Sequence, residues 1–165
     1  KKYTNGSVRG FTSPRWTLEY CIAMSSLSED FHKAVHYGMK ILNAREYISL
    51  TDKKITEANQ IVEEEAKQWH DLSQAETAYK IYSLMLNGDG KSSLKAIVAQ
   101  CLASILHWKI SVIPSELTQE KMFDLDLYAL KTDEEKKSEL KSKIERDQFL
   151  SYIVNAVKYA AGEAV

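Results

Sequence analysis

The stretch LNGDGKSSLKAIVAQCLASIL places a lysine where it could bind a phosphate group. Gly88, Gly90 and Lys91 precede a helical pattern, as the last residues of a nucleotide-binding loop do. Such a loop has the form Gly-x4-Gly-Lys-Ser/Thr and follows a buried strand. Here Met85 occupies the position of the first glycine, and an amphipathic helix precedes the loop. The pattern therefore disfavours a nucleotide-binding loop, and the glycines fit the end of one helix and the start of the next.

Lys91 itself is not explained by helix termination. A cation at a helix N-terminus opposes the helix dipole by about 0.3–1 kcal/mol, so the lysine is locally unfavourable. Two interpretations remain open: Lys91 is a surface residue without a specific role, or it is placed there to contact an anion.

Glu19 lies in the segment WTLEY, within the first turn of a predicted helix that follows TSPRW. The helix dipole favours an acidic residue at this position, which is a sufficient structural explanation. The residue also lies where an extended segment leads into a helix, and binding sites are often built at such transitions. Glu19 is therefore a candidate for a single metal ligand.

Two other pairs have the spacing of metal ligands. His32 and His36 lie four residues apart, but the residues between them lack the glutamate that serves as the base in zinc hydrolases. We interpret this pair as part of a partly exposed helical face. Asp124 and Asp126 form a D-x-D pair that could bind Mg²⁺ in a strand context. Their surroundings predict a helix or turn, so we interpret them as capping or solvated residues.

The spacing of apolar residues predicts an all-α fold, a bundle of about six helices. Only two prolines and six glycines interrupt the 165 residues. At most one short strand remnant is expected, at Ser7 to Phe11. The helices are expected near residues 17–27, 28–42, 55–72, 74–86, 92–105 and 149–157. Thr17 or Ser13 is available to cap the first helix. The fifth helix is expected to carry an apolar stripe made of Leu94, Ile97, Val98, Cys101, Leu102 and Ile105, and the last helix an inner face made of Phe149, Leu150, Ile153, Val154 and Val157. The charged run TDEEKKSELKSKIERD is most simply a solvated helical face.

Composition limits the classes of function. The 22 basic and 23 acidic residues give a formal net charge of −1, so a nucleic-acid partner can be argued only from local patches. Cys21 and Cys101 lie in apolar helical patterns and suggest no disulfide framework, which favours a cytoplasmic protein. No apolar run approaches the roughly 20 residues of a membrane span, so no membrane partner is expected. The sequence starts in mid-pattern without a methionine, and we expect a piece of a longer polypeptide.

Three segments resemble the overcoming-lysogenization-defect (OLD) family of ATP-dependent endonucleases. SPRWTLEYCIAMSSL is similar to the region that follows the TOPRIM sheet in that family. GDGKSSLKAIVAQCLA resembles a later Gly-Lys helix start, and RDQFLSYIVNAVKYAAG resembles the C-terminal helix. The segments occur in family order across nearly the whole chain. The resemblance implies that residues 1–16 are the end of a TOPRIM-like sheet or a linker, and that residues 17–165 form a helical domain.

In that family, TOPRIM carboxylates hold two divalent cations, usually Mg²⁺ or Mn²⁺, that activate water for phosphodiester hydrolysis. By resemblance, Glu19 would assist metal binding and Lys91 would be the catalytic lysine that neutralises the scissile phosphate. The main metal-binding acids and the ATP-binding domain would lie outside this chain, which makes the chain incomplete as an enzyme. The implied partners are DNA, the TOPRIM and ATPase domains of the same polypeptide, and further copies in a homo-oligomer that acts in phage defence. The expected DNA-phosphate contacts are Lys2, Arg9, Arg15 and Lys95.

A second interpretation is a non-catalytic all-α module that binds a partner protein. It predicts an exposed apolar stripe on the third or fourth helix. The endonuclease interpretation instead predicts that Glu19 and Lys91 face a common groove. Two groups that share one phosphate must lie within about 15 Å of each other, given side-chain reach and the spacing of two-metal sites.

Overall fold

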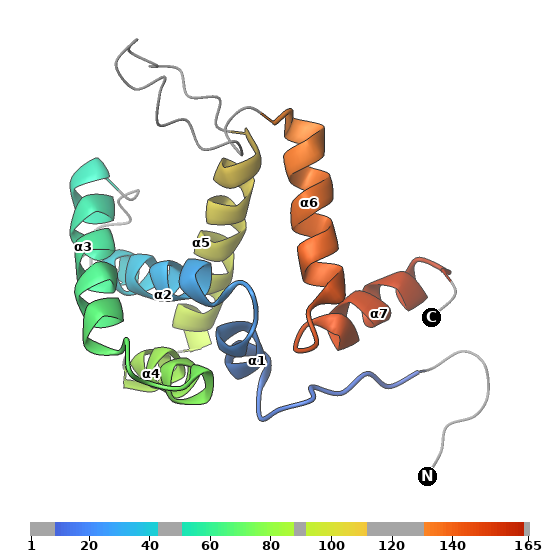
Figure 1. Ribbon diagram of the computed structural model, residues 1–165, viewed down its shortest axis with the longest axis horizontal. Helices are drawn as coiled ribbons and strands as arrows, with labels where there is room; N and C mark the ends of the chain where they lie inside the picture. The colour runs from blue at the N-terminus through green and yellow to red at the C-terminus, as the bar shows by residue number, and fades with distance from the viewer. Residues whose placement is uncertain (1–8, 43–50, 88–91, 112–130, 164–165) are drawn as a thin grey trace.

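The computed structural model describes residues 9–42, 51–87, 92–111 and 131–163, and over these residues the protein is all-helical (Figure 1). The described chain contains seven α-helices and no strand, so the predicted all-α fold is confirmed. Of the predicted strand remnant, residues 9–11 belong to no strand, and Ser7 and Val8 lie outside the described residues. The helices are α1 (Leu18–Met24), α2 (Ser28–Leu42), α3 (Asp52–Gln68), α4 (Gln74–Asn87), α5 (Ser92–Ser111), α6 (Asp133–Arg146) and α7 (Ser151–Ala160).

Three helices begin at a threonine whose side chain satisfies a backbone N–H group that the helix itself leaves unpaired. The hydroxyl of Thr17 accepts a hydrogen bond from the backbone N–H of Tyr20 at the start of α1, as the sequence predicts. Thr51 caps α3 in the same way, and Thr132 forms a reciprocal capping box with Glu135 at the start of α6. Such caps fix where each helix begins and contribute about 1 kcal/mol each.

The centre of the fold is α2, which contacts α1, α3, α4 and α5 and has its most extensive contact with α5. Gly38 permits the close approach of α2 and α5. A Cβ atom at this position would lie 2.8 Å from Cγ2 of Val98, closer than packed carbon atoms approach. In Figure 1, α2 crosses the molecule between α3 and α5.

The apolar core fills the space among α1 to α5. Its largest fully buried side chains come from four of these helices and are Phe31, Ile81, Leu94, Val35, Val98 and Cys21. On α5, four residues of the predicted stripe are buried, namely Leu94, Val98, Cys101 and Ile105. The other two, Ile97 and Leu102, are partly buried and pack against the core. Cys101 lies in apolar surroundings, and burial raises the pKa of its thiol to about 11, so it is unreactive near neutral pH.

The last two helices pack on the opposite side of α5 from α3. α6 runs beside α5, and α7 contacts α6 (Figure 1). Phe149 and Leu150, expected on the inner face of the last helix, are buried but precede α7. Val157 was expected on the same inner face and is 63% exposed, so that expectation is wrong. It lines an open groove instead of the core.

No helix within the described ranges combines the length and the apolar character needed to span a membrane.

Candidate functional site

Glu19 projects from the first turn of α1 toward α5. Its carboxylate Oε1 lies 2.7 Å from Nζ of Lys95, and the glutamate side chain is only 18% exposed. Burial alone would raise the pKa of Glu19, but the hydrogen bond and the charge of Lys95, together with backbone and Thr17 hydrogen bonds, outweigh it and lower the pKa. The same interaction raises the pKa of Lys95. Both groups are therefore ionised near neutral pH.

The ion pair lines a hollow of about 490 Å³ between α1 and α5. Glu19 and Lys95 are the charged residues of its lining. The others are apolar, and Leu18 and Ile22 from α1 and Ala99 and Leu102 from α5 are among them. A carboxylate and an ammonium thus face one side of an otherwise apolar recess. Because the Lys95 side chain is 55% exposed, solvent still screens the pair.

Lys91 lies outside the described residues, as do Lys2, Asp124 and Asp126. Its place in the chain is nevertheless informative, because α5 begins at Ser92, the next residue. Lys95 follows Lys91 by four residues in the sequence and lies in the first turn of α5. Lys95, a predicted DNA contact, is the α5 residue that pairs with Glu19. The ion pair therefore connects the start of α5 to α1.

The two arginines that were predicted to contact DNA, Arg9 and Arg15, are both exposed and both precede α1. Arg15 lies four residues before Glu19. Arg9 stacks over the ring of Phe11, with its guanidinium carbon 5.3 Å from the ring centroid. Phe11 in turn contacts Tyr159 of α7, at a centroid separation of 5.8 Å. Arg9 is thus associated with the α7 end of this segment and Arg15 with its α1 end.

An aromatic cluster surrounds the start of α1, and the sequence analysis did not identify it. It consists of Trp16, Tyr20, Tyr79 and Tyr82. Trp16 stacks on Tyr79 with an interplanar angle of 8°, yet Trp16 remains 67% exposed. The cluster joins the segment before α1 to α4. In the sequence only Trp16 and Tyr20 lie near each other, four residues apart, because the two α4 tyrosines lie more than 60 residues after Trp16.

A second polar cluster contradicts the interpretation of His32 and His36 as a partly exposed helical face. Both residues are buried, with exposed fractions of 4% and 5%. The Nε2 atoms of His32 and His36 lie 2.6 Å and 2.7 Å from the same Oε2 atom of Glu65 on α3. Burial lowers the pKa of His32 more than Glu65 raises it, so this imidazole is neutral near pH 7. The pair faces α3, which covers it from solvent.

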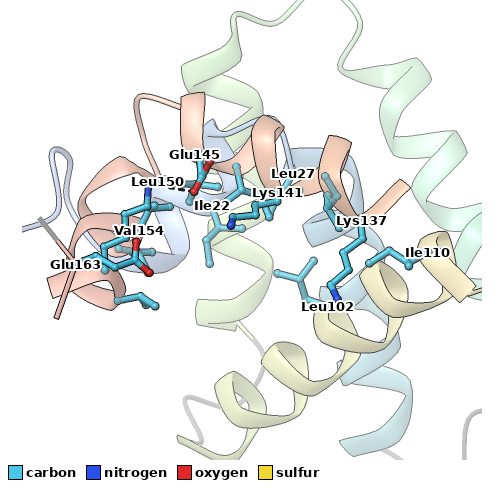
Figure 2. A pocket seen from close by; sticks show the side chains of 15 residues that line it. Ile22, Leu27, Leu102, Ile110, Lys137, Lys141, Glu145, Leu150, Val154 and Glu163 are labelled. Carbon is cyan, nitrogen blue, oxygen red and sulfur yellow. Dashed lines mark ion pairs between the residues drawn. The ribbon is translucent and has the colours of Figure 1, made fainter. Parts of the chain in front are cut away.

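An apolar groove of about 570 Å³ lies where α1, α5, α6 and α7 meet (Figure 2). Its floor is formed by residues such as Ile22, Leu102 and Val154. Lys137 and Lys141 of α6 also line it. The protein-interaction interpretation predicts an exposed apolar stripe on the third or fourth helix, whereas this groove is lined by α1, α5, α6 and α7. It results from the incomplete cover that α6 and α7 give to α5.

Comparisons with protein-family models, with curated proteins and with solved structures find no match.

Proposed function

We propose that this chain is the helical part of a metal-dependent DNA endonuclease of the OLD and TOPRIM type, with Glu19 as a metal ligand and Lys91 as the lysine that contacts the scissile phosphate. One observation carries the proposal. Glu19 of α1 forms an ion pair with Lys95 of α5, which follows Lys91 by four residues in the sequence. This ion pair links the first turn of α1 to the first turn of α5, which supports the arrangement that the resemblance implies.

The chemistry of Glu19 suits one position in such a metal centre. A carboxylate oxygen is a ligand that Mg²⁺ and Mn²⁺ prefer, and the lowered pKa of Glu19 keeps the oxygen available. Within the described ranges, Glu19 belongs to no group of three or more potential metal ligands. It therefore fits as a single ligand, and the remaining carboxylates would come from a TOPRIM domain elsewhere in the polypeptide. Such ions supply an activated water and stabilise the charge of the phosphodiester transition state.

Two lysines of this chain, Lys95 and Lys91, would bind the phosphate group of the substrate at that site. Lys95 balances the charge of Glu19 and is itself 55% exposed, so it can turn toward a phosphate when Glu19 has another cationic partner. Lys91 would present a compact ammonium at the start of α5, where unpaired backbone N–H groups also favour an anion. This role accounts for a cation in a position that the helix dipole disfavours.

The aromatic cluster provides a surface that suits unpaired bases. Trp16 and Tyr79 are 67% and 52% exposed and lie beside the helix that carries Glu19. Bases stack on such side chains without sequence preference, and each stack contributes about 1–3 kcal/mol to binding. A strand whose phosphate contacts Lys95 would pass close to this cluster, because Tyr82 lies within electrostatic reach of Lys95. DNA is the partner proposed, and ATP would be bound by a separate domain of the complete polypeptide.

Plasmid nicking by the complete polypeptide, in the presence of Mn²⁺ or Mg²⁺, tests the proposal. Glu19→Gln removes the anionic ligand and keeps the size of the side chain, and we expect it to lower the nicking rate by about 100-fold or more. Glu29→Gln is the matched control, because Glu29 also lies in the first turn of a helix and pairs with a lysine, Lys33. Equal nicking rates for the two variants would contradict the proposal.

A non-catalytic module that binds a partner protein is the second candidate. Tyr79 and Leu86, seven residues apart and so on one face of α4, are each 52% exposed, as that interpretation predicts for this helix. The nicking assay separates the two candidates. If the chain is a module of this kind, Glu19→Gln should leave any nicking by the complete polypeptide unchanged.

A further inference from the structure

We infer that His32, His36 and Glu65 form a binding site for a transition-metal ion, Zn²⁺ above all, that joins α2 to α3. His32 and His36 are separated by one turn of α2, so both imidazoles leave the same face of that helix. Glu65 lies in the last turn of α3, three residues before its end, and faces both rings. One potential ligand atom from each residue can be chosen so that all three lie within 4.8 Å of one another.

The three side chains are held in a geometry close to that of a bound site. A tetrahedral zinc ion with ligand bonds of about 2.1 Å separates its ligand atoms by about 3.4 Å. The Nε2 atoms of the two histidines lie 2.6 Å and 2.7 Å from Oε2 of Glu65. Entry of an ion therefore requires the carboxylate to withdraw by less than about 1 Å. Glu65 can do so because its side chain is 20% exposed, whereas the imidazoles are almost fully enclosed.

Neighbouring residues restrict the orientation of the rings. The indole of Trp69, at the end of α3, stacks on His32 with centroids 5.0 Å apart and an interplanar angle of 20°. The two imidazoles lie 5.2 Å apart at 52°, so their Nε2 atoms converge without the rings being parallel. Ligands that are oriented in advance lose little entropy when an ion binds, and aromatic enclosure limits the access of water.

The donor set selects the class of ion. Mg²⁺ and Ca²⁺ take oxygen ligands, and a site with two imidazoles suits them poorly. Two histidines and one glutamate are a known zinc ligand set, with a water in the fourth position. The chain provides no glutamate within the HKAVH segment, so the general base of helical zinc hydrolases is absent from this motif. The site is therefore assigned to binding an ion without catalysis, and the consequence of that binding is structural.

That consequence follows from the position of α3, whose extensive contacts are with α2. The two helices are otherwise joined by the buried Ala58 and Val62, by a hydrogen bond from Tyr37 to Asn59 and by the ion pair of Lys40 and Glu57. An ion held by His32, His36 and Glu65 would clamp α3 onto the centre of the fold. The site is separate from Glu19 in the chain and uses a different class of ion, so it is independent of the proposed endonuclease function.

Titration of the EDTA-treated chain with Co²⁺, followed by displacement with Zn²⁺, tests the inference. We expect the visible absorption of tetrahedral Co²⁺ at one ion per chain, its loss on addition of Zn²⁺, and no displacement by excess Mg²⁺. Zinc at about 100 times its Kd should raise the Tm by about 5–10 °C. Absence of both the absorption and the Tm shift would overturn the inference.

Variants locate the ion. Glu65→Gln keeps a hydrogen-bond acceptor between the rings and removes the anionic ligand, and we expect it to abolish the Co²⁺ spectrum while the circular dichroism stays helical. His36→Ala should do the same, and Glu65→Gln decides the question if the alanine variant fails to fold. The matched controls are His70→Ala and His107→Ala, which change the two exposed histidines. Retention of the spectrum by Glu65→Gln, or its loss in the control variants, would refute the site.

Discussion

Two glutamates each connect neighbouring helices, but they do so in opposite surroundings. Glu19 joins α1 to α5 through a lysine that is 55% exposed, whereas Glu65 joins α3 to α2 through two almost fully buried imidazoles. An exposed ammonium on a flexible stem can leave its carboxylate at little cost in free energy. Buried rings cannot move without disturbing the packing around them. The first arrangement therefore suits exchange of partners, and the second suits a fixed site that selects its ligand by geometry.

The largest difference between these regions should appear in stability. His36→Ala removes a buried ring and one of two partners of Glu65, and we expect it to lower the free energy of unfolding by about 2–4 kcal/mol. Urea denaturation of the metal-free chain measures this value. A loss below about 0.5 kcal/mol, typical of surface substitutions, would show that the histidine cluster is not a buried part of the fold.

Binding of single-stranded DNA should depend on the aromatic cluster beside Glu19 and not on the histidine cluster. Trp16→Ala removes the most exposed ring of the aromatic cluster, and we expect it to weaken the binding of a single-stranded oligonucleotide by about 5- to 150-fold, because one stacked base contributes about 1–3 kcal/mol. Fluorescence anisotropy measures the Kd. His70→Ala, which changes an exposed residue outside the cluster, serves as the control. Equal affinities for the two variants would remove the aromatic cluster from the proposed DNA surface.

The smallest effect is expected for Lys95→Ala, which should lower the free energy of unfolding by no more than about 1 kcal/mol because the lysine is largely solvated. The pKa of Glu19 is lowered in the folded chain, so its stabilising contribution is present above the ordinary carboxyl pKa of 4.5 and is lost as the pH falls through the folded value. The difference between the parent chain and Lys95→Ala should therefore be full near pH 7 and disappear in acid. Urea denaturation at several pH values checks this, and a difference that persists at pH 2 would contradict the ion pair.

Features encoded locally could be predicted from the sequence. The Thr17 cap, the end of α4 at Asn87 before the glycines, and the buried stripe of α5 all follow from residue type and helical spacing. The proximity of α1 to α5 was expected only through the resemblance. It is supported by the contact of Glu19 with Lys95, a residue that had been assigned to DNA.

Features that depend on packing between distant segments could not be predicted. Spacing places His32 and His36 on one face of α2, but nothing local indicates that Glu65, 33 residues after His32, will cover that face. The aromatic cluster likewise brings Trp16 to Tyr79 from a separate helix. Val157 follows the apolar period of the last helix, yet it is 63% exposed and lines the open groove instead of the core.

The nicking of supercoiled plasmid by a Lys91→Ala variant of the complete polypeptide tests the central claim most directly. Lys80→Ala, which changes an exposed lysine of α4, is the control. We expect Lys91→Ala to abolish nicking, with unchanged helical content and unchanged metal binding, while the control retains the parent rate. Undiminished nicking by Lys91→Ala would contradict the claim that α1 and the start of α5 meet at a scissile phosphate.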